Sequence, residues 1–153
     1  MLSSAIILAG GFGTRLKSVV PDLPKPMAPV NARPFLEYQL DYLSRSGIKV
    51  VCISLGYMAD AIRGHFGTSY KGLQLSYAIE TEALGTGGGI RLALERVNQN
   101  EVLVLNGDSF FEIDIQHFYA QHLKSQAQYS LALRRVEDAS RYGAITIDEN
   151  CRL

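Results

Sequence analysis

Tryptophan is absent from this chain of 153 residues, and cysteine occurs only twice, at Cys52 and Cys151. Two cysteines cannot build the disulfide framework of a small secreted domain, and no Cys and His residues stand at the spacing of a zinc site. No apolar run reaches the roughly 20 residues of a membrane helix. The first residues also lack the basic start and apolar core of a signal peptide. We therefore predict a cytoplasmic protein with free thiols and no membrane partner.

An excess of either charge is also missing, because Lys and Arg together number 15 and so do Asp and Glu. A nucleic-acid-binding surface would need a basic excess, so we expect no nucleic-acid partner. A small anion held by two or three cations stays compatible with this balance. Hydrophobic residues make up 47% of the chain, which is enough for the core of one domain over residues 1–153.

The chain also lacks the usual signs of covalent catalysis. It has no Ser/His/Asp or Cys/His arrangement, and we expect its three histidines, His65, His117 and His122, to lie on the surface. No Gly-Lys-Ser/Thr sequence marks a Walker A loop. A reaction at phosphorus depends on positioning and charge neutralisation more than on a protein nucleophile, so these absences are compatible with one.

A glycine-rich turn is the first positive signal. It follows the apolar residues 5–8, which predict a buried strand. Glycines let backbone N–H groups approach a ligand closely, and the planar guanidinium of an arginine suits phosphate. We predict that the turn holds a nucleotide triphosphate through Leu8, Ala9, Gly10, Gly11, Gly13, Thr14 and Arg15. A tight turn without a ligand is the alternative.

The same turn argues against a dinucleotide-binding dehydrogenase. Leu16 stands where that fingerprint has its third glycine. No acidic residue closes a strand about 20 positions further on, where one would contact a ribose.

All five prolines fall between Pro21 and Pro34. Proline fixes φ, so this segment is expected to be a stiff, ordered loop. Within it, Pro26 biases the backbone of Lys25 toward the extended region, which would aim the ammonium group at a phosphate. A solvated lysine is the alternative.

Hydrophobic periodicity predicts alternating strands and helices. Strands are expected at residues 5–8, 48–54, 73–79, 101–106, 129–136 and 143–147. Helices are expected at 36–46, 57–66, 90–97 and 114–125. This order is typical of an α/β fold with a Rossmann-like, mostly parallel sheet and helices on both faces.

Three motifs follow predicted strands: the first glycine turn, the glycines at 85 and 87–89, and Asp108. Ligands in open parallel sheets bind beyond the carboxyl ends of the strands, so the three are expected to converge on one site. Asp108 leaves its strand through a glycine. A carboxylate facing phosphates there could bind Mg²⁺, which takes one or two carboxylates plus phosphate oxygens. Its alternative role is to cap a turn.

These motifs resemble the sugar-1-phosphate nucleotidyltransferase family, in the same order and across nearly the whole chain. They are residues 8–16, Pro24-Lys25-Pro26, residues 84–88 and Asn106-Gly107-Asp108. The resemblance implies the fold of nucleotide-diphospho-sugar transferases. It also implies a reaction in which a sugar phosphate oxygen attacks the α-phosphorus of a nucleoside triphosphate and releases pyrophosphate. Residues 54–58 and 80–89 are most similar to members that use GTP and D-glycero-D-manno-heptose 1-phosphate. Mannose or glucose 1-phosphate is the alternative acceptor.

The resemblance also assigns roles to residues. Arg15 would neutralise the leaving pyrophosphate, Lys25 would hold the α-phosphate, and Asp108 would be one Mg²⁺ ligand. The remaining implied contacts are Gly85 and Thr86 to the nucleotide, and Asn106, Tyr142 and Gly143 to the sugar.

The resemblance also implies a contact to the base five residues before Gly85, which is the position of Glu80 here. A carboxylate only accepts hydrogen bonds, and guanine offers two neighbouring donors, N1–H and N2–H₂, where uracil offers one. Glu80 therefore favours guanine. Glu82 is an alternative acceptor, and a solvated Glu80 without a ligand is an alternative role.

The family's later Glu-Lys-Pro segment and second metal-binding Asp do not occur in these 153 residues. We expect a truncated enzyme with a nucleotide part at about 1–110, the start of a sugar part at 111–153, and weak or no turnover. Apolar surface left uncovered would favour a homo-oligomer. A nucleotide-binding regulatory or assembly module is the alternative function.

Overall fold

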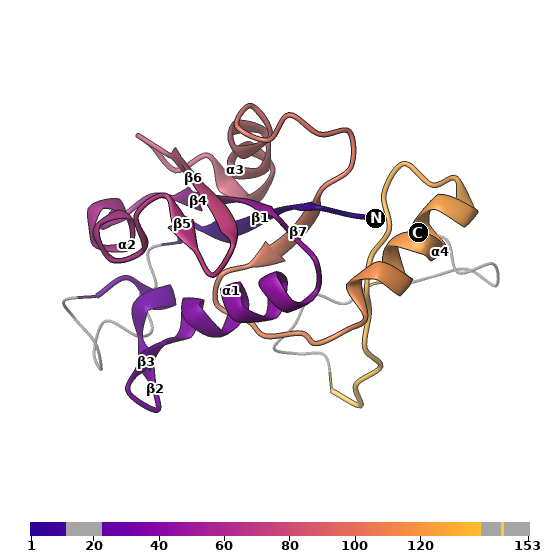
Figure 1. Ribbon diagram of the computed structural model, residues 1–153, viewed down its shortest axis with the longest axis horizontal. Helices are drawn as coiled ribbons and strands as arrows, with labels where there is room; N and C mark the ends of the chain where they lie inside the picture. Colours follow the sequence, from indigo (N-terminus) through magenta and orange to yellow (C-terminus); the bar gives the residue numbers. More distant parts are fainter. Residues whose placement is uncertain (12–22, 139–144, 146–153) are drawn as a thin grey trace.

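The computed structural model describes residues 1–11, 23–138 and 145, and its centre is a five-stranded sheet (Figure 1). The strands are β1 (Ser4–Ala9), β4 (Val50–Leu55), β5 (Ser69–Tyr70), β6 (Leu73–Ile79) and β7 (Leu103–Asn106). Their order is β5-β6-β4-β1-β7, and only β5 runs antiparallel to its neighbour. The prediction of a mostly parallel sheet is therefore confirmed.

Four α-helices accompany the sheet in the described part of the chain: α1 (Phe35–Arg45), α2 (Ala59–Phe66), α3 (Gly85–Leu94) and α4 (Ile115–Ser125). All four predicted helices are confirmed. The largest shift of a boundary is at α3, which begins within the glycine cluster itself. None of the helices described is long and apolar enough to span a membrane.

The two faces of the sheet carry separate cores, because successive residues of a strand point to opposite sides. Ala5 and Ile7 of β1 belong to the larger core, which α1, α2 and Ile115 of α4 cover. Ile6 belongs to the smaller core, which is covered by α3. Figure 1 shows α3 above the sheet and α1 below it. Helices thus lie on both faces, as predicted.

The predicted fifth strand is wrong. Residues 129–136 form no strand, and Tyr129 and Leu131 are 70% and 51% exposed. Alternating apolar residues indicate a half-buried strand only where another strand offers hydrogen-bonding partners, and no described strand pairs with this segment. Of the predicted strand at 143–147, all residues but Ile145 lie outside the described ranges.

The described part of the proline segment, which begins at Leu23, is ordered as predicted. It forms a short 3₁₀ helix, η1 (Lys25–Met27), followed by the two-stranded sheet of β2 (Pro29–Val30) and β3 (Arg33–Pro34). The extended backbone expected at Lys25 is wrong, because Lys25 begins η1. The amide of Met27 donates to the carbonyl of Pro24, and this turn outweighs the bias that Pro26 imposes.

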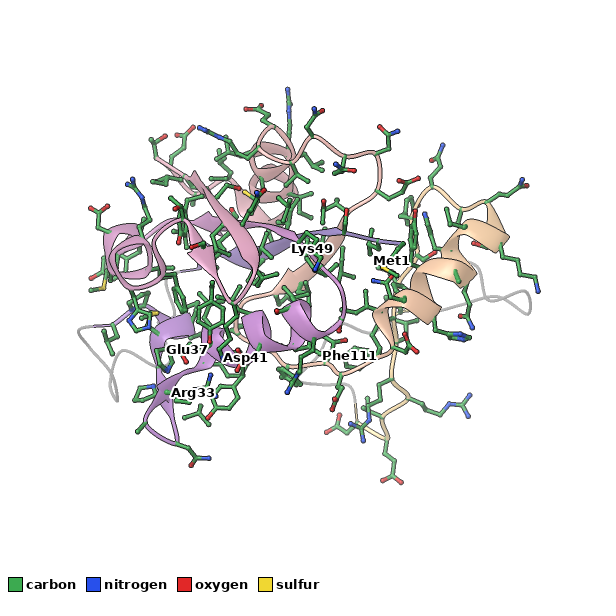
Figure 2. The ribbon with its side chains drawn as sticks, viewed as in Figure 1. Met1, Arg33, Glu37, Asp41, Lys49 and Phe111 are labelled. Carbon is green, nitrogen blue, oxygen red and sulfur yellow. The ribbon has the colours of Figure 1, made fainter. Side chains whose placement is uncertain are left out.

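A cluster of charges, which we call the Asp41 cluster, joins α1 to β3 and β5. Asp41 accepts hydrogen bonds from Arg33 (2.9 Å), Tyr70 (3.1 Å) and Lys71 (2.8 Å), and Arg33 also pairs with Glu37. Figure 2 labels Arg33, Glu37 and Asp41 side by side. Partial burial alone would raise the pKa of Asp41, but these three hydrogen bonds outweigh it and lower the pKa to about 2.

Asp41→Asn is therefore expected to reduce stability at neutral pH. A carboxylate whose pKa is lowered by folding stabilises the protein above its unfolded pKa of about 4, and this contribution is lost as the pH falls toward 2. We expect a loss of about 1–2 kcal/mol at pH 7, limited by solvent screening of the exposed Arg33 and Lys71. Urea unfolding at pH 7 and pH 3 measures it. Asp60→Asn, at a 96% exposed carboxylate, is the control. An equal loss at both pH values would contradict the role of ionised Asp41.

Candidate active site

The predicted motifs meet at the carboxyl edge of the parallel sheet. Leu8 of β1 pairs with Asn106 of β7, and Ala9 pairs with Leu55 of β4, which in turn pairs with Ile79 of β6. The residues that follow these strands, Gly10, Asp108 and Glu80, therefore leave the sheet along one edge. The convergence expected from the sequence is confirmed for the described residues.

Lys25 and Asp108 are in direct contact although 83 residues separate them. The ammonium group donates to Asp108 Oδ2 at 2.5 Å. The two side chains are 35% and 42% exposed, so a ligand can reach both. Hydrogen bonding by Lys25, aided by Ser109, lowers the pKa of Asp108 against the opposing effect of partial burial. The site thus holds an ionised carboxylate beside a cation.

A close backbone contact brings Asp108 to the glycine turn. The amide of Gly107 donates to the carbonyl of Leu8 at 2.7 Å, which continues the pairing of β7 with β1. A Cβ at Gly107 would lie 2.8 Å from that same carbonyl oxygen. Only glycine permits this approach without a shift of the backbone, so Asp108 is set next to the end of β1.

Gln39 of α1 is a site residue that the sequence analysis missed. It is 1% exposed, and its Nε2 donates to the carbonyls of Asn106 (2.7 Å) and Ser109 (2.8 Å), on either side of Asp108. A buried amide that satisfies two carbonyls holds the turn that carries Asp108. The sequence does carry a signal for Gln39, because it is a polar residue on the apolar face of a predicted helix, next to Leu36 and Leu40.

Glu80 follows β6 and is held in place on two sides. Its Oε1 accepts from the hydroxyl of Ser54 (3.0 Å), and its Oε2 accepts from the amide of Leu84 (3.2 Å). Each carboxylate oxygen keeps a further lone pair for another donor. The side chain is half-buried rather than the solvated acid considered as its alternative. Glu82, the alternative acceptor, is exposed.

The other predicted contacts divide into two groups. Gly85 and Thr86 form the exposed first turn of α3, where backbone N–H groups lack helical partners. Asn106 is exposed at the end of β7. The remaining predicted residues lie outside the described ranges: Gly13, Thr14, Arg15, Tyr142 and Gly143.

The donor set fits a Mg²⁺ ion that is shared with a substrate. Asp108 supplies one ionised carboxylate, and the described residues contain no group of three or more Asp, Glu, His or Cys that could enclose a metal. Mg²⁺ is commonly bound by one or two carboxylates together with phosphate oxygens. Among the described residues of the site, Asp108 is thus a carboxylate that could hold a divalent metal.

Comparison with known proteins identifies the family. Residues 4–153 match the nucleotidyl transferase family. A D-glycero-alpha-D-manno-heptose 1-phosphate guanylyltransferase of Campylobacter jejuni is 46% identical over 95% of this chain, and the enzyme of that name from Aneurinibacillus thermoaerophilus is 43% identical over 92%. The chain belongs to the nucleotidyl transferase family.

A solved structure shares the fold. HddC from Yersinia pseudotuberculosis, complexed with GMP-PN, superposes with a TM-score of 0.79 and 34% identity over 97% of this chain. The alignment covers 66% of that protein, and 63% and 61% of the two enzymes above. The chain thus spans less than two thirds of the length of these relatives.

Proposed function

We propose that this protein transfers a guanylyl group from GTP to a sugar 1-phosphate, with D-glycero-α-D-manno-heptose 1-phosphate as the acceptor. The observation that carries the proposal is the Lys25–Asp108 pair at the end of β1, where the family resemblance expects a nucleotide. The heptose enzymes among its relatives support guanine and heptose as the substrates. We further propose a nucleotide part at about 1–110, the start of a sugar part after it, and a cytoplasmic location.

In the proposed reaction, a phosphate oxygen of the sugar 1-phosphate attacks the α-phosphorus of GTP. The new P–O bond forms as the bond from the α-phosphorus to the bridging oxygen breaks, and pyrophosphate leaves with the bonding electrons. The step needs no nucleophile from the protein, because the sugar phosphate oxygen is the nucleophile. The protein therefore acts by orienting the two phosphates and neutralising their charge.

Each proposed role uses the chemistry of one side chain. Lys25 has three N–H donors, so it can contact an α-phosphate oxygen while it keeps Asp108. The backbone at Gly10 and Gly11 would cradle the triphosphate, and Arg15 would neutralise the pyrophosphate. Asp108 would hold Mg²⁺, which supplies positive charge to the phosphates when bound.

Nucleotide binding tests this proposal directly. Calorimetric titration with GTP, UTP, dTTP and CTP in the presence of Mg²⁺ is expected to give the strongest binding for GTP. Pyrophosphate release is then compared with heptose, mannose and glucose 1-phosphates as acceptors. Binding of GTP without release in any of the three would favour the regulatory module instead. Absence of binding by all four nucleotides would refute the proposed function.

Glu80→Gln is expected to reduce the preference for GTP over UTP about tenfold. The amide keeps the shape of the side chain, but it replaces one acceptor of guanine N1–H and N2–H₂ with a donor. The ratio of dissociation constants for GTP and UTP measures the change. Glu95→Gln, on an exposed residue at the end of α3, is the control. An unchanged ratio in Glu80→Gln would remove the argument for guanine.

A further inference from the structure

Glu80 is enclosed by groups from several elements at the carboxyl edge of the sheet. Ser54, near the end of β4, donates its hydroxyl to Oε1, and the amide of Leu84 donates to Oε2. The backbone amide of Glu80 itself donates to the carbonyl of Leu55 at 2.7 Å. The carboxylate thus links the ends of β4 and β6 with the segment that leads into α3.

Two glycines complete this enclosure. A Cβ at Gly10 would lie 2.6 Å from Glu80 Oε1, and a Cβ at Gly89 of α3 would lie 2.9 Å from the same atom. Both distances are shorter than real Cβ contacts, so a side chain at Gly10 or Gly89 would require the Glu80 carboxylate to shift. Gly10 belongs to the turn that is expected to hold the triphosphate. The carboxylate, which is the predicted base contact, therefore lies beside a predicted phosphate contact.

Ser54 is fully buried, with no exposed surface, and its hydroxyl donates to Glu80. A buried hydroxyl without a partner is costly, so the serine and the carboxylate constrain each other. Without such a contact, a glutamate side chain keeps considerable rotamer freedom, and it would lose that freedom when a ligand binds. Ser54 removes that freedom in advance.

We propose that Ser54 is a positioning residue for base selection. It holds the carboxylate of Glu80 in the orientation that accepts hydrogen bonds from guanine. This inference rests on the proposed function, because it takes Glu80 as the group that contacts the base. Ser54 touches no substrate itself, so its contribution depends entirely on Glu80.

Ser54→Ala tests the inference. A hydrogen bond to a charged acceptor is lost, and we expect the preference for GTP over UTP to fall about three- to tenfold. The loss should lie in GTP affinity, with little change for UTP. Calorimetric titration of both nucleotides with Mg²⁺ on the 153-residue chain measures the ratio, and thermal unfolding of the same samples reports the stability.

Ser4→Ala is the matched control. Ser4 is also fully buried, stands in the same sheet and lies at the opposite, amino end of β1. The same hydroxyl is removed without a contact to Glu80. We expect the GTP to UTP ratio to stay at the wild-type value. If Ser54 had only a structural role, its variant would weaken both nucleotides equally and leave the ratio unchanged.

A double-mutant cycle with Glu80→Ala separates the possible outcomes. If Ser54 acts through Glu80, adding Ser54→Ala to Glu80→Ala changes the ratio no further. Additive effects, or an unchanged ratio in Ser54→Ala alone, would overturn the inference while leaving guanylyl transfer in place. A wild-type chain that binds GTP and UTP equally, or neither, would overturn the proposed function and this inference with it.

Discussion

Lys25→Ala is expected to lower the rate of pyrophosphate release from GTP and a sugar 1-phosphate about 10²–10³-fold. Removing one preorganised charge contact from a phosphoryl transition state typically has an effect of this size. The ammonium group is placed for such a contact, since η1 presents it to Asp108 at 2.5 Å at the end of β1. The loss should fall mainly on kcat, because the charge on the α-phosphate is greatest in the transition state.

Lys49→Ala is the control for this substitution. Lys49 is an exposed lysine just before β4, at the amino end of the sheet, and Figure 2 labels it. It should retain the wild-type rate. A Lys25→Ala variant with near-normal kcat would show that its assigned role is wrong.

Asp108→Asn is expected to reduce turnover by a similar factor, about 10²–10³-fold. The substitution keeps the shape of the side chain and its acceptor oxygen, but it removes the negative charge that would hold Mg²⁺ and that pairs with Lys25. Raising the Mg²⁺ concentration should restore part of the activity, because the substrate phosphates still bind the metal. The dependence of the rate on Mg²⁺ concentration is the measurement.

Glu112→Gln is the matched control for Asp108→Asn. Glu112 is an exposed carboxylate four residues further on and has no part in the proposed site. Its variant should keep the Mg²⁺ dependence of the wild type. An unchanged Mg²⁺ dependence in Asp108→Asn would contradict its role as a metal ligand. Unfolding of both variants checks that the turn held by Gln39 is intact.

The sequence predicted the parallel sheet because its signals are local. Residues 5–8, and residues 50–53 within the predicted strand 48–54, are apolar throughout, which is typical of strands buried on both faces. The motif after each strand then had to lie at one edge, since parallel strands end together. The convergence of the first glycine turn, the glycines at 85 and 87–89 and Asp108 could be inferred without coordinates for this reason.

The strand predicted at residues 129–136 is wrong because strand pairing is not a local property. The alternation of Tyr129, Leu131 and Leu133 fits the local pattern of a strand. A strand also needs a neighbouring strand as its hydrogen-bonding partner, and the local sequence does not specify one. In the described part of the chain, no strand pairs with this segment. The prediction at Lys25 is wrong for a similar reason. A hydrogen-bonded turn there outweighs the preference for extended backbone that the following proline imposes.

By itself, the order of residues determined the class of fold, the edge of the sheet where the candidate site lies and the chemical types of its residues. Those follow from periodicity and strand direction, which act over a few residues. Only the tertiary structure decided which groups touch: Lys25 on Asp108, Gln39 on the turn around it, and Ser54 on Glu80. Each contact joins positions at least 26 residues apart, so it depends on packing that no single stretch of the chain encodes.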